Sequence, residues 1–424
     1  MTAKQPARIQ EQMSMREAVD VAIVGGGIAG GALASALAHD GLGVVVLEAS
    51  ERYEDRVRGE SLMPWGVAEA RGLGVEKLFL DAGARVSATW VHYDDDVPPD
   101  ISVANPIPAG MMLPGIPGSL NLRHPEACSA LREGAQAAGV RFLTGVSDVT
   151  LQAGTRPTVT AVDHDGMPIE LGARLIVGAD GRNSTVRRQV GIELSRHEAT
   201  NMVGGVILEG DGLCDDHDFL ASSDDLFMAS FRQHDRQLRV YLCPSVEQKG
   251  RFSGPDGISR FLREANFKCL PFGEAISNAT PIGPLATYPG DDTWTTAPFA
   301  PGVVLVGDAA GWNNPIIGQG LSIALRDVRM VRDAIRDGGW GTGAFEAYGL
   351  ERIERMRRLR TAAMTMAAAM TDEADNRPAR RAKFLELQQT EPLMAGLMMG
   401  IYGGPENAPP EAVDGRLQKM IEAA

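Results

Sequence analysis

Apolar runs and turn residues alternate along the first fifty residues in a pattern that predicts a strand, a helix and a second strand. Residues 19–24 form one apolar run, residues 28–39 carry apolar positions at helical spacing before Gly41, and residues 44–48 form another run. Continuously apolar runs are typical of strands that are buried on both faces of a parallel sheet. We therefore expect a β-α-β unit of about thirty residues.

The rest of the chain predicts more of this sheet and a second one. Helical spacing recurs over residues 125–139, and short apolar strands are predicted at 175–177 and 303–306. Residues 86–93 and 202–241 show the looser alternation of strands with one exposed face. The fold class is therefore α/β, a Rossmann-like domain with an inserted, mainly antiparallel β-sheet domain. Beyond Arg326 the pattern becomes helical, which predicts a helical C-terminal segment.

Composition narrows the range of partners. The 424 residues are 44% hydrophobic and carry a formal net charge of −14, which disfavours nucleic acid and anionic membranes as partners. Cys128, Cys214, Cys243 and Cys269 form no Cys-x-x-Cys pair, and the seven histidines show no ligand spacing. We therefore expect no metal and a reducing, cytoplasmic location. No apolar run reaches the roughly 18 residues of a membrane span, and residues 1–18 predict a disordered tail.

The stretch "DVAIVGGGIAGG" carries the first chemical signal. Gly25, Gly27 and Gly30 match G-x-G-x-x-G between the first strand and the helix. The first glycine permits a tight turn, the second removes a Cβ that would block a phosphate, and the third lets helix and strand approach closely. Glu48 ends the next strand, where its carboxylate can accept hydrogen bonds from ribose hydroxyls. This arrangement predicts a dinucleotide whose diphosphate lies at the helix N-terminus.

Two later stretches resemble signatures of one family. "LIVGADGRNSTVRR" at 175–188 and "VVLVGDAAGWNNPIIGQGLSIALRD" at 303–327 are similar to motifs of the flavoprotein aromatic hydroxylases. These are single-component (class A) FAD-dependent monooxygenases, whose type member is para-hydroxybenzoate hydroxylase. The three motifs follow the family's order and cover most of the chain up to about residue 340. The resemblance implies that the dinucleotide is FAD, held in a Rossmann-like domain of the GR2 type.

The third motif also makes physical sense from its residues. A strand that ends at Gly307 and Asp308 lets the aspartate bond the ribityl hydroxyls. The helix that starts at residues 318–322 directs free N–H groups at the flavin, where its positive end stabilises the reduced anion. The family adds a D-G-x-x-S-x-x-R pattern, which runs here from Asp180 to Arg187, and arginines near Arg58 and Arg123. For these arginines, solvated salt bridges or a surface helix position are the alternatives. The expected cofactor-binding residues are Gly25, Gly27, Gly30, Glu48, Ala49, Arg58, Arg123, Asp180, Gly307, Asp308, Pro315, Gly318, Gly320 and Leu321.

The resemblance implies an activity. NADPH or NADH would reduce FAD, O₂ would form a C4a-hydroperoxide, and one oxygen atom would hydroxylate or epoxidise an aromatic or polycyclic small molecule. Candidates for proton transfer to or from a phenolic substrate are His92, Tyr93, His234 and Tyr241.

Departures from the family keep other activities open. Gly311 and Ser322 stand where many members have histidine and asparagine. The segment "RGESLMP" at 58–64 is also similar to a loop of flavin-dependent halogenases and geranylgeranyl reductases. The W-x-W-x-I-P segment of halogenases is absent from the sequence. An FAD-dependent reductase of an isoprenoid or other alkene is therefore the main alternative, followed by a halogenase and a non-catalytic flavin redox sensor.

The motifs also predict how the chain is divided. The predicted FAD-binding domain comprises residues 19–85, 120–200 and 295–345, and the substrate-binding domain comprises 86–119 and 201–294. A Pro- and Gly-rich loop at 105–118 is expected to connect them without helix. The helical segment 346–424 is expected to cap the substrate pocket, to form a homodimer interface, or both. Its methionines are expected mainly to pack in a core or an interface.

Overall fold

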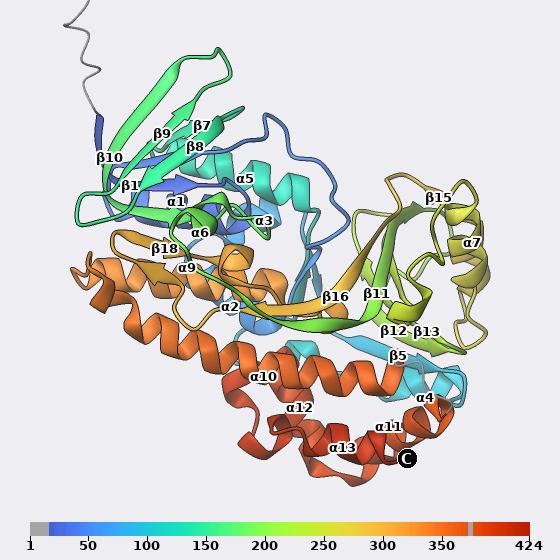
Figure 1. The fold of residues 1–424 in the computed structure, drawn as a ribbon. Coiled ribbons are helices and arrows are strands. Elements are labelled where there is room, and N and C mark those ends of the chain that lie inside the picture. Colours follow the sequence, from blue (N-terminus) through green and yellow to red (C-terminus); the bar gives the residue numbers. More distant parts are fainter. Residues whose placement is uncertain (1–16, 372–375) are drawn as a thin grey trace, which may run out of the picture.

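A computed structural model describes residues 17–371 and 376–424, and its first sheet is the expected Rossmann-like one (Figure 1). Five parallel strands follow the order β18-β10-β1-β2-β7. Their bounds are β1 Glu17–Val24, β2 Val44–Leu47, β7 Arg141–Leu143, β10 Pro168–Gly178 and β18 Val303–Leu305. Strand β1 begins inside the predicted tail of residues 1–18, of which residues 1–16 lie outside the described residues. The parallel sheet confirms the predicted β-α-β unit.

Antiparallel strands extend the first sheet at its β18 edge and along the first half of the interior strand β10. Strand β17 pairs with β18, and β9 and β8 follow β10. These strands are β17 Phe299–Ala300, β9 Thr158–Val162 and β8 Ser147–Gln152. A small separate sheet of β3 Ser61–Leu62, β6 Ser119–Asn121 and β4 Arg85–Ser87 lies between the larger units in sequence.

The second large sheet is mainly antiparallel, in the order β15-β11-β14-β13-β12-β5, with β16 also paired to β11. The strands are β5 Trp90–Asp94, β11 Ser195–Glu209, β12 Asp218–Ser223, β13 Leu226–Arg232, β14 Gln237–Cys243, β15 Thr280–Pro281 and β16 Ala286–Trp294. Figure 1 shows the long strands β11 and β16 running between the two sheets. Strand β11 passes through the predicted boundary at 200–201, so the domains share continuous strands rather than a flexible linker.

Helices cover the first sheet and position its loops. Helix α1 (Ile28–His39) packs against α5 (His124–Ala137) and α9 (Gly320–Arg336), and α9 packs against α2 (Pro64–Gly72). Shorter helices are α3 Glu76–Asp81, α4 Pro99–Ala104, α6 Thr185–Gln189, α7 Gly257–Glu264 and α8 Gly273–Asn278. The loop expected to lack helix contains one 3₁₀ turn, Ala109–Met111, because a single turn tolerates the prolines that a longer helix would not.

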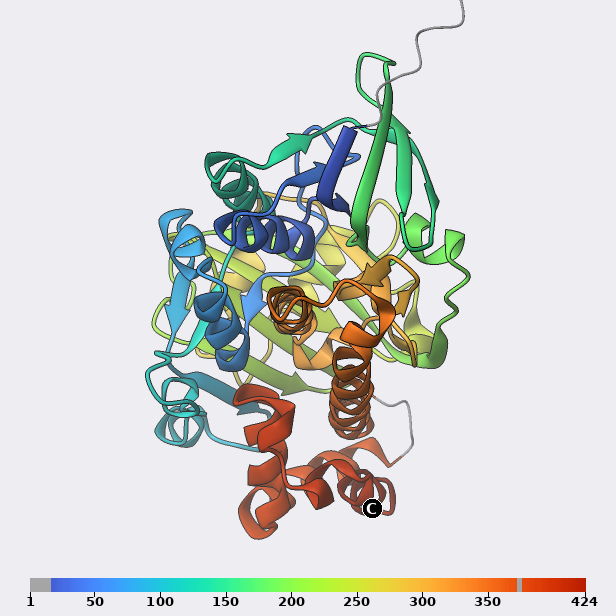
Figure 2. The same cartoon turned by 90° about the vertical axis from the view of Figure 1, so that its left-hand side faces the viewer.

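The C-terminal segment is helical as expected. It contains α10 Glu346–Met370, α11 Arg377–Thr390, α12 Pro392–Tyr402 and α13 Arg416–Glu422. Figures 1 and 2 show these helices at the opposite end of the molecule from strands β8 to β10. Their apolar side chains share one hydrophobic core with residues of the second sheet, including Trp90, Phe227 and Tyr241. Within the described residues, none of the helices is both long and apolar enough to cross a membrane.

Candidate active site

One cavity of about 810 Å³ joins the carboxyl ends of the parallel strands to the second sheet and the C-terminal helices. Its polar part is lined by the loops after β1, β2, β10 and β18. Its apolar part is lined by the second sheet, α10 and α12. Ligands of open α/β sheets bind outside the carboxyl ends of the strands, so this cavity is the candidate site.

The three glycines of the turn between β1 and α1 have different surroundings. A Cβ on Gly27 would meet nothing within 4 Å, so the backbone there faces open space in the cavity. Gly25 has φ +99°, and a Cβ on it would lie 2.4 Å from the Ala179 carbonyl oxygen. Gly30 does not line the cavity, and its Cβ would lie 1.9 Å from the Gly25 carbonyl oxygen. Gly25 and Gly30 therefore shape the turn, and Gly27 leaves room for a ligand.

Glu48 and Ala49 lie beside this turn in the cavity wall. The Glu48 carboxylate accepts hydrogen bonds from the Gly26 N–H at 2.6 Å and the Ser50 N–H at 2.7 Å. Each carboxylate oxygen keeps a lone pair, so ribose hydroxyls can still donate to it. These two bonds hold the carboxylate in place before any ligand arrives.

Two arginines and one aspartate face the middle of the cavity. Arg182 Nε lies 3.3 Å from Asp308 Oδ2, and its guanidinium lies 5.1 Å from the centroid of the Trp312 ring. Within residues 17–371 and 376–424, Arg58 forms no hydrogen bond or ion pair, and burial together with the Arg182 charge lowers its pKa. Two guanidinium groups thus share one carboxylate. This excess of positive charge suits an anionic ligand such as a diphosphate.

The start of α9 faces the same cavity. Pro315, Gly318, Gly320 and Leu321 line it, and a Cβ on Gly320 would meet nothing within 4 Å. The first N–H groups of a helix have no partner within the helix and carry partial positive charge. The helix end is therefore open to a ligand, as the third motif predicts.

A buried ion cluster holds the turn before α9. Asp327 of α9 accepts a hydrogen bond from the Gly307 N–H at 2.9 Å and pairs with Arg352 and Arg355 of α10. Arg352 also donates to the carbonyl oxygens of Ala310 at 2.8 Å and Gly311 at 2.9 Å. The C-terminal helix α10 thereby fixes the loop that carries Asp308.

The aspartate-glycine motif mainly forms hydrogen bonds to neighbouring backbone groups. Asp180 caps α6 by accepting from the Thr185 N–H at 2.6 Å and the Val186 N–H at 3.1 Å, and it also lines the cavity. Arg187 donates to the carbonyl oxygens of Ala309 and Arg182, each at 3.0 Å. The motif therefore ties α6 to the turn around Asp308.

Both departures from the family have a steric explanation. Gly311 has φ +113°, and a Cβ there would lie 2.5 Å from the Thr293 carbonyl oxygen, so a histidine would not fit. Ser322 Oγ accepts a hydrogen bond from the Met63 N–H at 3.2 Å and lies where a Cβ on Gly66 would be. Gly311 thus lets its loop approach β16 closely, and Ser322 lets α9 approach Gly66 of α2.

The far part of the cavity is apolar and aromatic. Four aromatic rings form a row of edge-to-face contacts. The ring centroids are 5.8 Å apart for Tyr402 and Trp90, 5.4 Å for Trp90 and Phe231, and 5.9 Å for Phe231 and Tyr241. The C-terminal helices contribute Met366, Met398, Ile401 and Tyr402 to the wall. The segment expected to cap the pocket thus forms part of it, and Met366 and Met398 line it rather than only packing in a core.

One polar pair interrupts this apolar wall. The Tyr241 hydroxyl donates a hydrogen bond to Glu60 Oε2, and both residues line the cavity. Glu60 Oε1 is buried and has no hydrogen-bond partner, although Arg239 Nε lies 3.4 Å from it. Burial raises the pKa of Glu60, and the charge of Arg239 opposes that rise. This carboxyl group therefore has a free acceptor in an apolar compartment.

The other candidates for proton transfer lie elsewhere. Tyr93 faces the opposite core of the second sheet, and His92 is half-buried outside the cavity lining with Nε2 3.2 Å from Ser222 Oγ. His234 lies in the turn after β13, against Gly83. None of these three lines the cavity, so their role in proton transfer to a substrate stays a prediction. Tyr241 lines it, but burial raises its pKa well above 10, so the hydroxyl keeps its proton and donates a hydrogen bond to Glu60.

Arg123 also lies outside the cavity lining. Its guanidinium pairs with Glu126 at 3.3 Å and does not line the cavity, whereas the next residue, His124, does. Burial and the charges of Arg58 and Arg56 lower the pKa of His124 to about 4. Sequence patterns also missed Glu60 and Arg182, although both stand within or beside motifs that the resemblance singled out. The motifs are defined by the residues next to Glu60 and Arg182. The direction of these two side chains depends on how the loops fold.

The residues fit a bound dinucleotide. The test is the bare backbone at Gly27 and Gly320, which side chains would otherwise fill, together with the unpaired Arg58 guanidinium. Every expected cofactor residue lines the cavity except Gly30 and Arg123.

Comparisons with known proteins agree with this geometry. The family model described as FAD binding domain matches residues 18–365. Squalene monooxygenase of Rattus norvegicus is 26% identical over 329 residues, 75% of this chain and 55% of that protein. A probable NADH-specific resorcinol 4-hydroxylase of Rhodococcus jostii is 34% identical over 183 residues, 42% of this chain and 34% of that protein.

A solved structure shares the fold. The p-nitrophenol 4-monooxygenase PnpA of Pseudomonas putida DLL-E4 superimposes with a TM-score of 0.76 at 19% identity, over 92% of this chain and 98% of that one. At this identity the likeness shows the fold alone. The chain spans about half the length of the first curated relatives it matches.

Proposed function

Because the chain belongs to the FAD binding domain family, we propose that it is an FAD-dependent monooxygenase. It uses NADPH or NADH and O₂ to hydroxylate or epoxidise an aromatic or polycyclic small molecule. The observation that carries this proposal is one cavity that joins an open glycine backbone to an apolar, aromatic compartment. When bound, FAD would supply the redox chemistry that activates O₂.

The cofactor would be held along the polar part of the cavity. The backbone at Gly27 and the N-terminus of α1 suit the diphosphate, and Glu48 suits the ribose. Arg58 and Arg182 add positive charge near Asp308, which suits the ribityl chain. The N-terminus of α9 suits the electron-rich edge of the flavin ring.

The apolar compartment supports the second half of the proposal. Its walls of aromatic, methionine and isoleucine side chains exclude water, which protects a reactive oxygen species from side reactions. The relatives named as squalene monooxygenase and resorcinol 4-hydroxylase act on apolar and phenolic compounds by their names. Both kinds of compound suit a compartment of this character.

Glu60 and Tyr241 would orient the substrate. A hydroxyl group of a phenolic substrate can donate to the free Oε1 of Glu60, and Tyr241 holds Oε2 in place. Arg239 pairs with Asp55 as well as Glu60, which keeps this polar end of the compartment rigid. Glu60 therefore replaces the histidines and tyrosines as the candidate proton acceptor.

The test is oxidation of NADPH and NADH by the FAD-loaded protein against a panel of phenols, polycyclic aromatics and isoprenoid alkenes. The proposal requires O₂ uptake that matches nicotinamide consumption and a product that gains one oxygen atom. A product that gains two hydrogens under anaerobic conditions supports the reductase instead. No turnover across the panel, with a partner that distinguishes the redox states, supports the sensor.

Location and assembly stay proposals. The four cysteines are free and buried, which supports a reducing, cytoplasmic environment. A homodimer, if it forms, has to use surfaces other than the cavity-lining faces of α10 and α12. Light scattering of the purified chain would measure its mass.

A further inference from the structure

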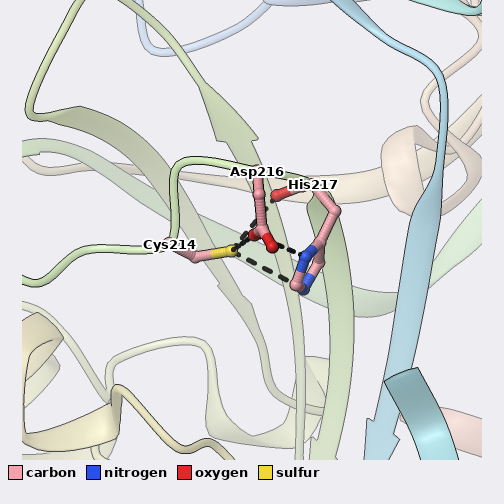
Figure 3. A group of neighbouring side chains, drawn as sticks. All are labelled: Cys214, Asp216 and His217. Atoms are coloured by element: carbon pink, nitrogen blue, oxygen red, sulfur yellow. Dashed lines mark hydrogen bonds and ion pairs between the residues drawn. The ribbon is translucent and has the colours of Figure 1, made fainter. Parts of the chain in front are cut away.

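Three side chains that can bind a metal lie together in the loop between β11 and β12 (Figure 3). Cys214 Sγ lies 3.3 Å from Asp216 Oδ1 and 3.5 Å from His217 Nε2. His217 Nδ1 lies 2.7 Å from Asp216 Oδ1. One short loop thus brings a thiol, a carboxylate and an imidazole to mutual contact.

This cluster is separate from the cavity described above. None of its three residues lines that cavity. Cys214 and His217 are buried, and the Asp216 side chain is 78% exposed, so the cluster has one side open to water. The hydroxyl of Tyr93 lies 3.0 Å from His217 Nε2 and closes the inner side. Asp216 is therefore the donor on the solvent side of the cluster.

The spacing of the Cys214 and His217 donor atoms matches that of two ligands of a tetrahedral zinc site. With Zn–S of about 2.3 Å and Zn–N of about 2.0 Å, tetrahedral angles place sulfur and nitrogen about 3.5 Å apart. The Cys214 and His217 atoms stand at that separation before any ion is present. Thiolate and imidazole also select zinc over magnesium or calcium, which prefer oxygen ligands.

We propose that Cys214, Asp216 and His217 bind one Zn²⁺ ion, with a water molecule as fourth ligand on the exposed side. Binding replaces the proton of the Cys214 thiol, which passes to solvent, while His217 binds as the neutral imidazole. Zinc binding therefore releases a proton and weakens as the pH falls.

The site would anchor the start of β12. The next residue, Asp218, accepts hydrogen bonds from Asn121 Nδ2 at 2.9 and 2.7 Å and from the Arg232 N–H at 3.0 Å. The carbonyl oxygen of Asp215 accepts a bond from Arg232 Nη1. An ion that fixes the loop at Cys214 would stabilise this junction between the second sheet and β6. The proposal does not depend on the proposed monooxygenase activity.

The test is zinc binding by the full-length, FAD-loaded protein after dialysis against a chelator. We expect isothermal titration with ZnCl₂ to show one ion per chain and zinc to raise the melting temperature. Titration with Co²⁺ should give visible bands of tetrahedral cobalt. Cys214→Ser and His217→Ala should each weaken zinc binding at least tenfold, and Asp216→Asn should weaken it less.

Two matched variants keep the test decisive. Cys269→Ser removes another buried thiol, and Asp215→Asn removes a neighbouring exposed carboxylate, and both should bind zinc as the wild type does. An unchanged ratio of FAD to protein shows that each variant is folded. The proposal is overturned if the wild type takes up no stoichiometric zinc. It is also overturned if Cys214→Ser binds as tightly as Cys269→Ser.

Discussion

At the scale of single residues, the glycine turn shows how one motif contains separate tasks. Gly27 has φ −71°, which every amino acid can adopt, so its lack of a side chain serves the open space in front of it. At Gly30, the Gly25 carbonyl oxygen occupies the space that a Cβ would need. Gly27 is therefore a candidate for ligand binding, and Gly30 is needed for folding.

This difference predicts two outcomes for the same substitution. Gly27→Val should leave the melting temperature nearly unchanged and weaken FAD binding at least tenfold, about 1.4 kcal/mol, because the new side chain fills the diphosphate space. Gly30→Val should lower the yield of folded protein, because its Cβ has no room. Flavin titration and thermal melting measure the two effects. Tight FAD binding by Gly27→Val would contradict the assignment of the cradle.

His92 gives a prediction about pH. Burial and the charge of Arg381 lower its pKa from 6.5 to about 4, so the folded chain resists a proton that the unfolded chain accepts. Its contribution to stability is present above pH 6.5 and is lost as the pH falls towards 4. Relative to His92→Gln, the wild type should lose up to about 1.4 kcal/mol of unfolding free energy per pH unit in that window.

Denaturant unfolding at several pH values checks this. His164→Gln is the matched control, because that side chain is 59% exposed. If the unfolding free energies of wild type and His92→Gln change with pH in the same way, His92 has the same pKa in the folded and unfolded chain, which contradicts the prediction.

At the scale of elements, helix α10 does more than cover the molecule. The sequence shows an arginine-rich helix, and the structure shows that Arg352 and Arg355 are buried against Asp327 and the turn at residues 307–311. A helix that follows the expected FAD-binding domain thus holds the loop of the third motif in place. Cofactor binding and C-terminal folding are therefore coupled.

Arg352→Met should expose this coupling. Removing one partner of a buried pair costs about 3–5 kcal/mol, so we expect a lower melting temperature and weaker FAD binding. Arg357→Met on the same helix is the control, since that side chain is 40% exposed and its pair with Glu354 contributes at most about 1 kcal/mol. Equal effects of both substitutions would argue against a specific role for the buried cluster.

At the scale of the whole molecule, the substrate compartment is assembled from three parts of the chain. The second sheet supplies Trp90, Phe231 and Tyr241, the segment after β2 supplies Glu60, and α10 and α12 supply the outer wall. No single unit encloses this space. The size of substrate that the protein accepts should therefore respond to the C-terminal helices.

Met366→Trp tests this arrangement. The larger side chain should fill the compartment and weaken binding of polycyclic phenols at least tenfold, without changing FAD content. Binding can be followed by the change in flavin absorbance, which needs no turnover. Met364→Trp, on the same helix but outside the cavity lining, should bind these ligands as the wild type does. Unchanged binding by Met366→Trp would place the substrate elsewhere.

The sequence predicted most of the first sheet and the cofactor residues because these signals are local. A strand, a glycine turn and a helix start are written in consecutive residues, and each has a direct steric or electrostatic meaning. The pattern around Arg123 could not specify the direction of its side chain, and its neighbour His124 lines the cavity instead. Tyr93 points to the other face of β5 from Trp90, because successive residues of a strand point to opposite faces. His92 shares the face of Trp90 but lies outside the cavity lining, which the strand pattern does not specify.

By itself, the sequence determined the β-α-β unit, the bare backbone at Gly27 and the position of Asp308 at a strand end, because each depends on residues adjacent in the chain. Only the tertiary structure decided that Glu60 meets Tyr241, that Arg352 holds the turn at 307–311, and that α12 closes the compartment. Those contacts join residues that are far apart in sequence. Their burial and direction follow from how sheets and helices pack, which no local pattern specifies.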